Sequence, residues 1–336
     1  MLLVLGIETS FDDTGVAFYD RQFGLVLSIK SSSFQKGCNY GGIVPLLTAL
    51  DQMGCLLINL KKLMFERRGR QKDISLLCFT MEPGLTLSLM TGFVVTQLLS
   101  YLLNSDVIPT NHITSHVASV KLTKQHLNLP LLSLVISGKT TALYYLPSFQ
   151  KGLRIKGHQS SSVGEVLDKT ARALFHPTTL SQSGGALISK MAHEPTLKFR
   201  GIRILEAEKM RFDWEAIRTF FLVCSNTLSF WQRRGGKGGP LKQARSAFIL
   251  NALGHLSNIL GLITKAFLRK LNGCQLVLSG GVSSNSQLKL KIKQQINLNQ
   301  LLVCPKLIRT DNGAMVAHLG ALLNLFSSFQ SKQYGL

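Results

Sequence analysis

Residues 2–20 read LLVLGIETSFDDTGVAFYD, which is an apolar run, a polar turn and a second apolar run. Two apolar runs joined by a short polar turn predict a buried β-hairpin, and this turn presents carboxylates and hydroxyls. The same plan returns at residues 131–146, LLSLVISGKTTALYYL, in the second part of the chain. One such hairpin in each half indicates an internally duplicated fold.

Helix and strand patterns fill much of the remaining chain. Two helices are predicted between the hairpins, at residues 46–68 and 85–103. Apolar strands at 274–278 and 301–304 then lead through turns into helices that start near 286 and 314. Residues 175–239 are the least regular part, and their RRGGKGG run is typical of a loop.

Composition indicates a basic globular protein. At 336 residues the chain is long enough for roughly two lobes, and with 45% hydrophobic and 16% charged residues it is neither fibrous nor disordered. Its 38 Lys and Arg against 17 Asp and Glu give a net charge of +21, which favours a polyanionic partner such as nucleic acid. Basic proteins that read no nucleic acid are the alternative. The clusters to inspect are Lys61, Lys62, Arg67, Arg68, Arg70 and Lys72, and Arg233, Arg234 and Lys237.

Compartment signals are few. The six cysteines form no C-x-x-C pair, so neither a zinc ribbon nor a disulfide framework is indicated. The apolar start runs into a polar turn and not into a cleavage site, and no Arg-rich presequence is visible. The uncharged span 84–104 is long enough to cross a bilayer, but it contains Thr, Ser and Gln, so we expect a buried helix and no membrane partner.

His112 and His116 are candidate metal ligands. They are four residues apart, so on a helix they share one face and can bind one ion. Two ordinary histidines are the alternative, and HITSH lacks the Glu of the H-E-x-x-H metalloprotease motif. Asp311 offers an oxygen ligand to the same ion, or else it is the N-cap of the helix that starts near Ala314.

Two turns have the small and polar character of phosphate sites. Ser137 and Gly138, followed by Thr140, allow close backbone approach and supply hydroxyls. A second turn, Gly280–Asn285, opens a helix whose backbone N–H groups suit a phosphate or ribose. An ordinary strand-to-helix turn is the alternative there.

Several charged side chains lie near these turns. Asp168 and Lys169 are expected at the start of a helix, where they either orient a sugar or solvate the helix end. Glu8, Asp12 and Asp13 crowd the first turn, and like charges so close on a basic chain suggest metal binding or proton transfer.

Eight motifs along the chain resemble, in the same order, those of the TsaD family, which makes the tRNA modification threonylcarbamoyladenosine. They are GIETSFDDTGVA, YGGIVP, PGLTLSL, HITSH, SSVGEVLDKTAR, SGGA, SGGVSSN and TDNGAMVA, and they span Gly6 to about Leu325. The wording EPGLTLSL, LLSLVISG and LSQSGGA resembles the mitochondrial branch most.

The resemblance implies an α/β fold of the two-lobed actin/Hsp70/sugar-kinase-like (ASKHA) type, with duplicated RNase-H-like subdomains and a nucleotide cleft. The expected lobes are 1–115, completed by the C-terminal helix at about 314–336, and 116–313. The implied metal ligands are His112, His116 and Asp311, and the implied adenylate-binding residues are Ser137, Gly138, Asp168, Gly185 and Asn285. Asp12 and Asp13 are expected beside the reacting centre.

The implied reaction transfers a threonylcarbamoyl group from L-threonylcarbamoyladenylate to the N6 amine of the adenosine 3′ of the anticodon, position 37 of ANN-decoding tRNAs, and releases AMP. It needs one divalent metal of the Fe or Zn type and no organic cofactor beyond the adenylate. By resemblance we expect a homodimer in the mitochondrial matrix.

The chain departs from the family pattern at positions expected at or near the cleft. The family has Cys at Phe11, a Glu, an Arg and a His at Leu46, Leu50 and Gln52, and SGGHT where this chain has Lys139 and Thr140. An Asp is common near Ser161, and the SFSGLKT motif is barely recognisable near Phe212. A catalytically impaired nucleotide- or tRNA-binding relative is therefore the second hypothesis, and a sugar kinase of the same superfamily is the third.

Overall fold

The computed structural model describes residues 3–32, 44–66, 73–123, 126–138, 140–158, 162–175, 184–191, 219, 222–223, 239–271, 274–296, 301–304 and 308–334. Positions discussed above that lie outside these residues are Arg67, Arg68, Arg70, Lys72, Lys139, Ser161, Phe212, Arg233, Arg234 and Lys237.

Two compact units make up the chain. Unit 1 comprises Met1–Leu127, Leu146–Gly152 and Cys304–Leu336, and unit 2 comprises Asn128–Tyr145 and Leu153–Val303. The lobes expected from the sequence, 1–115 with the C-terminal helix and 116–313, stay a prediction.

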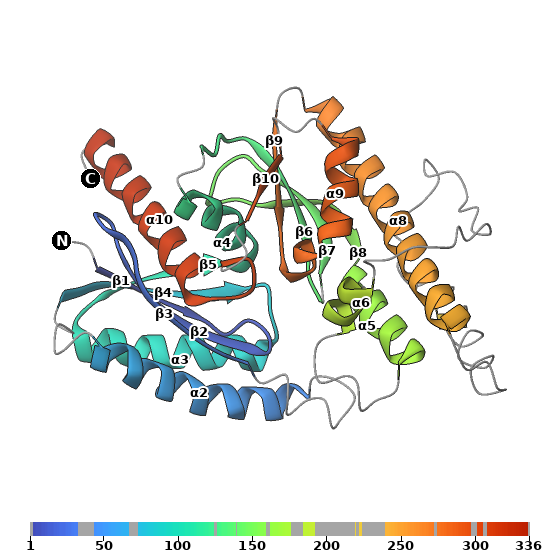
Figure 1. Cartoon of the computed structure of the whole chain (residues 1–336). Coiled ribbons are helices and arrows are strands. Elements are labelled where there is room, and N and C mark those ends of the chain that lie inside the picture. Colours follow the sequence, from blue (N-terminus) through green and yellow to red (C-terminus); the bar gives the residue numbers. More distant parts are fainter. Residues whose placement is uncertain are drawn as a thin grey trace. The chain divides into compact units, whose positions relative to one another are not determined.

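The first predicted hairpin is confirmed as the start of the unit 1 sheet. Its strands are β1 (Leu3–Glu8), β2 (Asp13–Asp20), β3 (Gly24–Ser32), β4 (Ile74–Glu82) and β5 (Asp106–Asn111), in the order β3-β2-β1-β4-β5 (Figure 1). β1 pairs antiparallel with β2, which pairs antiparallel with β3, whereas β1, β4 and β5 run parallel. The third strand, β3, was not predicted, because its half-exposed residues lack a clear apolar run.

Helices cover both faces of this sheet. α2 (Pro45–Glu66) and α3 (Thr86–Leu103) pack on one face around a core that includes Leu5, Leu56 and Val95. α10 (Gly313–Tyr334) packs on the other face, and α4 (His112–Ala118) and the 3-10 turn η3 (Ser119–Thr123) also belong to unit 1 (Figure 1). A side chain at Gly6 would overlap the backbone of Gly313 and Ala317. This close approach brings the start of α10 down onto β1.

Unit 2 repeats the plan of unit 1. Its sheet contains β6 (Leu131–Ile136), β7 (Thr141–Leu146), β8 (Leu153–His158), β9 (Gln275–Ser279) and β10 (Leu301–Val303), in the order β10-β9-β6-β7-β8. When the strands of each sheet are counted along the chain, both sheets have the order third, second, first, fourth, fifth. The predicted duplication of an α/β fold is therefore confirmed.

The longer helices in the described part of unit 2 are α5 (Val163–Leu174), α6 (Gly184–Met191), α8 (Gly239–Lys270) and α9 (Ser286–Gln295), with the 3-10 turn η5 (Gly281–Ser284) before α9. Residues from all four helices enter one core with β6, β7, β9 and β10, which includes Leu134, Val166, Ile188, Leu253 and Leu288.

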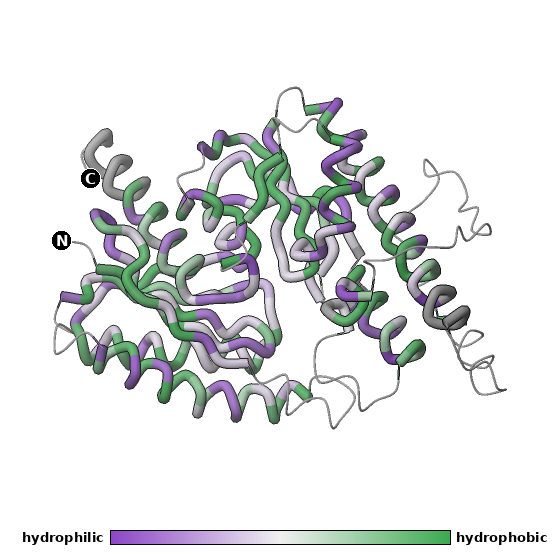
Figure 2. The backbone as a smooth tube through the Cα atoms, in the orientation of Figure 1, coloured by the Kyte–Doolittle hydropathy of each residue, from purple (hydrophilic) through white to green (hydrophobic). Residues whose placement is uncertain are grey.

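The sequence predicted a buried helix at 84–104. The helix forms as α3, but the prediction that it is buried is wrong for one side. α3 and the segment Arg245–Lys270 of α8 are both long and apolar enough to cross a membrane, but only 28% of the α3 window is buried, against 67% for α8. Figure 2 shows apolar residues along most of α3. Its exposed apolar side chains are Leu87, Met90, Phe93, Val94, Leu98, Tyr101 and Leu102.

Candidate metal centre and adenylate turns

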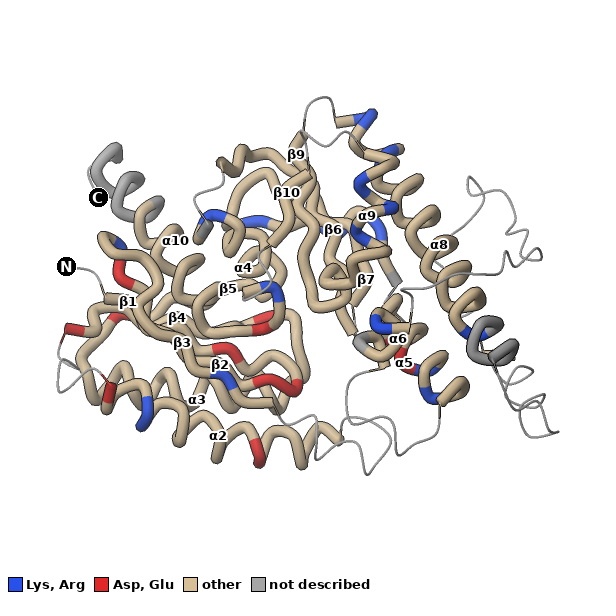
Figure 3. Tube along the Cα trace, viewed as in Figure 1, with Lys and Arg blue, Asp and Glu red and all other residues tan. Residues whose placement is uncertain are grey.

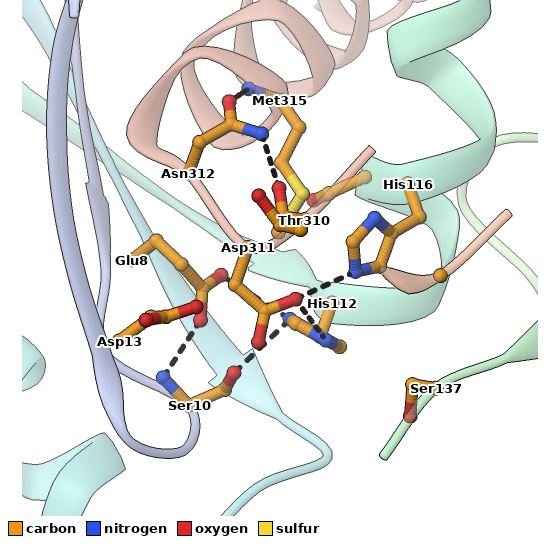
Figure 4. Close-up of polar contacts among 12 residues, drawn as sticks. Glu8, Ser10, Asp13, His112, His116, Ser137, Thr310, Asp311, Asn312 and Met315 are labelled. Carbon is orange, nitrogen blue, oxygen red and sulfur yellow. Dashed lines mark hydrogen bonds and ion pairs between the residues drawn. The ribbon is translucent and has the colours of Figure 1, made fainter. Parts of the chain in front are cut away.

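Two histidines of α4 and one aspartate before α10 meet within unit 1 (Figure 4). Oδ1 of Asp311 lies 3.0 Å from Nε2 of His116 and 3.6 Å from Nε2 of His112. One ligand atom from each residue falls within 4.8 Å of the other two. Ligands at about 2.1 Å from a shared ion are about 3.4 Å apart in tetrahedral geometry, so these separations suit a single metal.

An asparagine cap fixes the start of α4. Asn111 Oδ1 accepts hydrogen bonds from the backbone N–H groups of Ile113 and Thr114, at 3.0 and 3.2 Å. Because the helix starts at His112, the four-residue spacing brings both imidazoles onto one face. Their rings meet edge-on with centroids 4.6 Å apart.

The alternative role for Asp311, as an N-cap, is wrong. Asn312 caps α10 instead, since its Oδ1 accepts from the N–H of Met315 at 3.0 Å (Figure 4). The side-chain amide of Asn312 also donates to the carbonyl of Thr310 at 2.7 Å. This leaves the Asp311 carboxylate directed at the histidines.

Glu8 orients His112 from the other side of the ring. It is fully buried at the end of β1, and its Oε2 lies 3.2 Å from Nδ1 of His112. The N–H of Ser10 donates to Glu8 Oε1 at 2.7 Å, and the hydroxyl of Thr80 donates to Oε2. A carboxylate on one imidazole nitrogen is the usual support for metal binding by the other. The sequence flagged Glu8 as a crowded carboxylate but did not reveal this partner.

The charges of the site depend on one another. Burial lowers the pKa of His112, but Glu8 and Asp311 raise it more, to about 9. Burial raises the pKa of Asp311, but the charge of His112 and the hydrogen bond from His116 hold it well below its usual range. The two carboxylates that keep a proton on His112 are the groups that would balance a divalent cation.

The donor set fits a transition metal. Two imidazole nitrogens and one carboxylate oxygen suit zinc and ferrous iron, and three protein ligands leave positions open for a substrate. His116 Nδ1 is buried and has no hydrogen-bond partner within the part of the chain that the structure describes. The residues present therefore fit the metal that the motifs imply.

The first turn holds a second charged group. Lys30 of β3 contacts Asp13 with its Nζ 2.6 Å from Oδ2, and the same Nζ lies 3.1 Å from the hydroxyl of Thr310. Burial raises the pKa of Asp13 above its ordinary value in spite of Lys30. Asp12 is half-buried beside it. Lys30 was not predicted, because it lies in the strand that the sequence did not reveal.

Gln52 of α2 holds this turn in place. Its side chain is fully buried, and Nε2 lies 2.7 Å from the carbonyl of Phe11 and 3.1 Å from that of Asp13. Among the departures expected at the cleft, Leu46 and Leu50 are 59% and 65% exposed. Both belong to the first two turns of α2, and their place at or near the cleft stays a prediction.

In unit 2, hydrogen bonds close the turn after β6. Ser137 N–H donates to the carbonyl of Thr140 at 2.7 Å, and Thr140 N–H donates to the Ser137 hydroxyl at 2.8 Å. Ser162, the cap of α5, donates to the carbonyl of Gly138 at 2.6 Å. A Cβ at Gly138 would meet nothing within 4 Å, so this backbone borders open space.

Asp168 and Gly185 contact each other directly. The N–H of Gly185, at the start of α6, donates to Asp168 Oδ1 at 2.8 Å. Asp168 lies in the middle of α5 and not at a helix start, because Ser162 caps that helix six residues earlier. Its neighbour Lys169 pairs with Glu165 at 2.6 Å.

Asn285 caps α9 at the end of the glycine turn. Its Oδ1 accepts from the N–H of Leu288 at 3.0 Å, and its amide donates to the Ser189 hydroxyl at 2.7 Å. Gly280 has a φ of 87° and lies against Ile136, a position where a Cβ would be strained. The turn is thus a tight, fixed link between β9 and α9.

Solved structures with a similar chain path show the fold alone. T. kodakarensis HypF aligns with 96% of this chain and 47% of its own at 15% identity and a TM-score of 0.58. Component A of the Acidaminococcus fermentans (R)-2-hydroxyglutaryl-CoA dehydratase aligns with 95% of this chain and 97% of its own at 11% identity and a TM-score of 0.54. Both are consistent with the two-lobed ASKHA architecture expected from the motifs.

The relatives that match this chain in sequence share one protein name. The tRNA N6-adenosine threonylcarbamoyltransferase of Sulfurihydrogenibium sp. (strain YO3AOP1) is 32% identical over 324 residues, which cover 95% of this chain and 90% of the relative. That of Buchnera aphidicola subsp. Schizaphis graminum (strain Sg) is 30% identical and covers 95% and 92%. The family profile "TsaD: tRNA N6-adenosine threonylcarbamoyltransferase" matches residues 26–318. The chain belongs to the TsaD family.

Proposed function

We infer that this protein is a tRNA N6-adenosine threonylcarbamoyltransferase, an acyltransferase that modifies tRNA. The family match over residues 26–318 carries this inference, and it coincides with the convergence of His112, His116 and Asp311. We propose L-threonylcarbamoyladenylate as the donor and adenosine 37 of ANN-decoding tRNAs as the acceptor.

In this reaction the N6 amine attacks the carbamoyl carbon. A C–N bond forms, the bond from that carbon to the phosphate oxygen breaks, AMP leaves, and the amine loses a proton. The mixed anhydride is already activated, so the protein has to position it and stabilise charge. Asp12 and Asp13 are the proposed residues beside the reacting centre. Burial raises the pKa of Asp13, which makes its carboxylate a better proton acceptor than an ordinary aspartate.

One divalent metal of the Fe or Zn type is the proposed cofactor. His112, His116 and Asp311 would hold it, and Glu8 would keep the His112 ring in the binding orientation. When bound, such a metal would neutralise the phosphate charge of the donor and polarise the donor oxygen that contacts it.

The proposed adenylate-binding residues are Ser137, Gly138, Asp168, Gly185 and Asn285. The open backbone at Gly138 allows a phosphate or ribose to approach closely, whereas the N–H of Gly185 already donates to Asp168. The side chains of Asp168 and Asn285 already bond protein groups, so their role is to fix these turns while the backbone faces the ligand.

We also propose that the protein is a homodimer of the mitochondrial matrix. The exposed apolar sides of α2 and α3 support self-association, since an apolar surface of this extent is unusual on a monomer. The mitochondrial assignment rests on the motif wording alone.

The test is transfer of labelled threonylcarbamoyl from fresh adenylate to an unmodified ANN-decoding tRNA by the metal-loaded protein. We expect labelled tRNA with the wild type and none with Asp311→Ala. Lys151→Gln, at an exposed position of unit 1, serves as the control and should retain activity.

A catalytically impaired relative that binds nucleotide or tRNA is the second candidate. It is motivated by Gln52, which binds the turn carbonyls where the family has a histidine. Tight adenylate binding without transfer by the folded, metal-loaded wild type would decide for this candidate.

A further inference from the structure

One long part of the chain contains no acidic residue. From Ala216 to Thr310 the sequence has no Asp or Glu but has fourteen Lys and Arg. This part includes α8, β9, α9 and β10 of unit 2. Figure 3 shows basic positions on α8 and α9, whereas unit 1 has several acidic positions near its first turn. The basic excess of the protein is therefore concentrated in unit 2.

α8 and α9 lie side by side, so their basic residues share one part of the surface. Nζ of Lys291 lies 2.7 Å from the place where a Cβ at Gly254 of α8 would be. The Gln295 amide donates to Asn258 Oδ1 at 2.7 Å. Lys265, Arg269 and Lys270 are exposed on α8, and Lys289 and Lys293 are half-buried on α9.

Helix capping does not account for these cations. Lysines favour the last turn of a helix, where they offset the helix dipole, and Arg269 and Lys270 fit that rule. Lys289, however, lies in the first turn of α9, where a cation is unfavourable, and Lys265 precedes the last turn of α8. Cations gathered on one surface without acidic neighbours create a positive potential that attracts a polyanion.

We propose that the surface formed by α8 and α9 binds the sugar–phosphate backbone of the substrate tRNA. This inference rests on the proposed function. Lys289 N–H donates to the carbonyl of Asn285, and Lys293 lies about 12 Å along the helix from Asn285 at 1.5 Å per residue. An RNA backbone that follows α9 would therefore lead away from the proposed adenylate turn, where the acceptor adenosine of the anticodon loop would lie.

RNA fits this surface better than a membrane does. A helix that lies on lipid presents a continuous apolar face. The apolar residues of α8, including Phe248, Leu253 and Leu260, are buried in the core of unit 2. Leu262 and Leu290 are exposed large apolar residues of these helices, and two leucines do not make an apolar face.

The test compares two charge-matched double variants of the full-length protein, Lys265→Gln with Lys293→Gln, and Arg21→Gln with Lys151→Gln. The second pair removes two exposed cations from unit 1. The measurements are the Kd for unmodified tRNA at several salt concentrations, kcat and KM for transfer, and thermal melting as a fold control.

For the α8/α9 pair we expect Kd and KM for tRNA to rise on the order of tenfold, and the salt slope to fall by about 1.5–2. We expect kcat at saturating tRNA to stay unchanged, and the unit 1 pair to shift Kd less than about twofold. Equal shifts in both pairs, or no shift in the α8/α9 pair, would overturn the proposal. The proposal would also be overturned, in favour of a membrane, if the wild type binds phosphatidylserine vesicles and the Lys265→Gln/Lys293→Gln variant loses that binding while its tRNA affinity is unchanged. A wild type that shows this pattern of tRNA binding but no transfer would keep the surface and refute the proposed function.

Discussion

Glu8 and His112 lie 104 positions apart in sequence and meet with Oε2 3.2 Å from Nδ1. The contact joins the end of β1 to the first residue of α4. Because Glu8 engages Nδ1, the opposite nitrogen of the ring faces Asp311. The proposed metal centre therefore depends on a residue outside its three candidate ligands.

Replacement of Glu8 by Gln should weaken the metal site without removing a ligand. The amide keeps the size of the side chain but not its charge, so we expect the metal Kd to rise about 10–100-fold. Competition with a chromogenic chelator measures this change. Glu66→Gln, at an exposed position of α2, is the control. An unchanged Kd in a folded Glu8→Gln protein would show that His112 needs no carboxylate support.

Gln52→Ala should destabilise the protein and loosen the first turn. The substitution leaves the carbonyls of Phe11 and Asp13 without the donor that they share, at a cost of about 1–3 kcal/mol. Chemical denaturation measures this loss, and transfer activity should fall with it. Lys61→Ala on the same helix should change stability by less than about 0.5 kcal/mol. Equal stability of the two variants would mean that Gln52 does not hold the turn.

His318 should make the protein sensitive to acid. Burial and then Lys121 lower the pKa of His318 to about 4, and its ring is buried beside Tyr19. The unfolded chain takes up this proton near pH 6.5, so the stabilisation is full above that pH and is lost as pH falls towards 4. At pH 5 the loss is about 2 kcal/mol.

His318→Leu removes this titration and keeps a similar volume. Between pH 7.5 and pH 5, we expect the free energy of unfolding to fall by about 2 kcal/mol less in the variant than in the wild type. Denaturant curves at both values of pH, with metal content held equal, provide the measurement. A constant difference between the two proteins would contradict the assignment.

Phe93→Asp should separate the proposed dimer. Phe93 is 45% exposed on α3 among other apolar side chains, and a charge there cannot be buried without a partner. Light scattering should give a mass near 37.0 kDa for the variant and twice that for the wild type. Phe23→Asp, at a 70% exposed turn position, is the matched control and should stay dimeric. A monomeric wild type would refute the proposed dimer.

Sequence patterns predicted the parts of the fold that depend on local order. The hairpins, α2, α3 and the strand–turn–helix repeats follow from apolar runs and turn residues. The four-residue spacing selected His112 and His116, and the resemblance to the TsaD motifs added Asp311. β3 was not predicted because its residues are half-exposed. Lys30, which lies in β3 and pairs with Asp13, was therefore not predicted either. The role of Glu8 depends on a contact between distant segments, which no local pattern encodes. The choice between Asp311 and Asn312 as the helix cap required backbone geometry.

The two asparagine caps have a consequence for how the protein would acquire the proposed metal. Asn111 fixes the backbone next to His112, and Asn312 does the same next to Asp311, through bonds that contain no ion. In many small zinc domains the ion itself pays the entropy of ordering its ligands, so the apoprotein is unfolded. In this protein the surrounding fold already orders the candidate ligands before an ion binds. The apoprotein should therefore stay folded during loading, exchange one ion for another without refolding, and take its metal identity from supply as much as from structure.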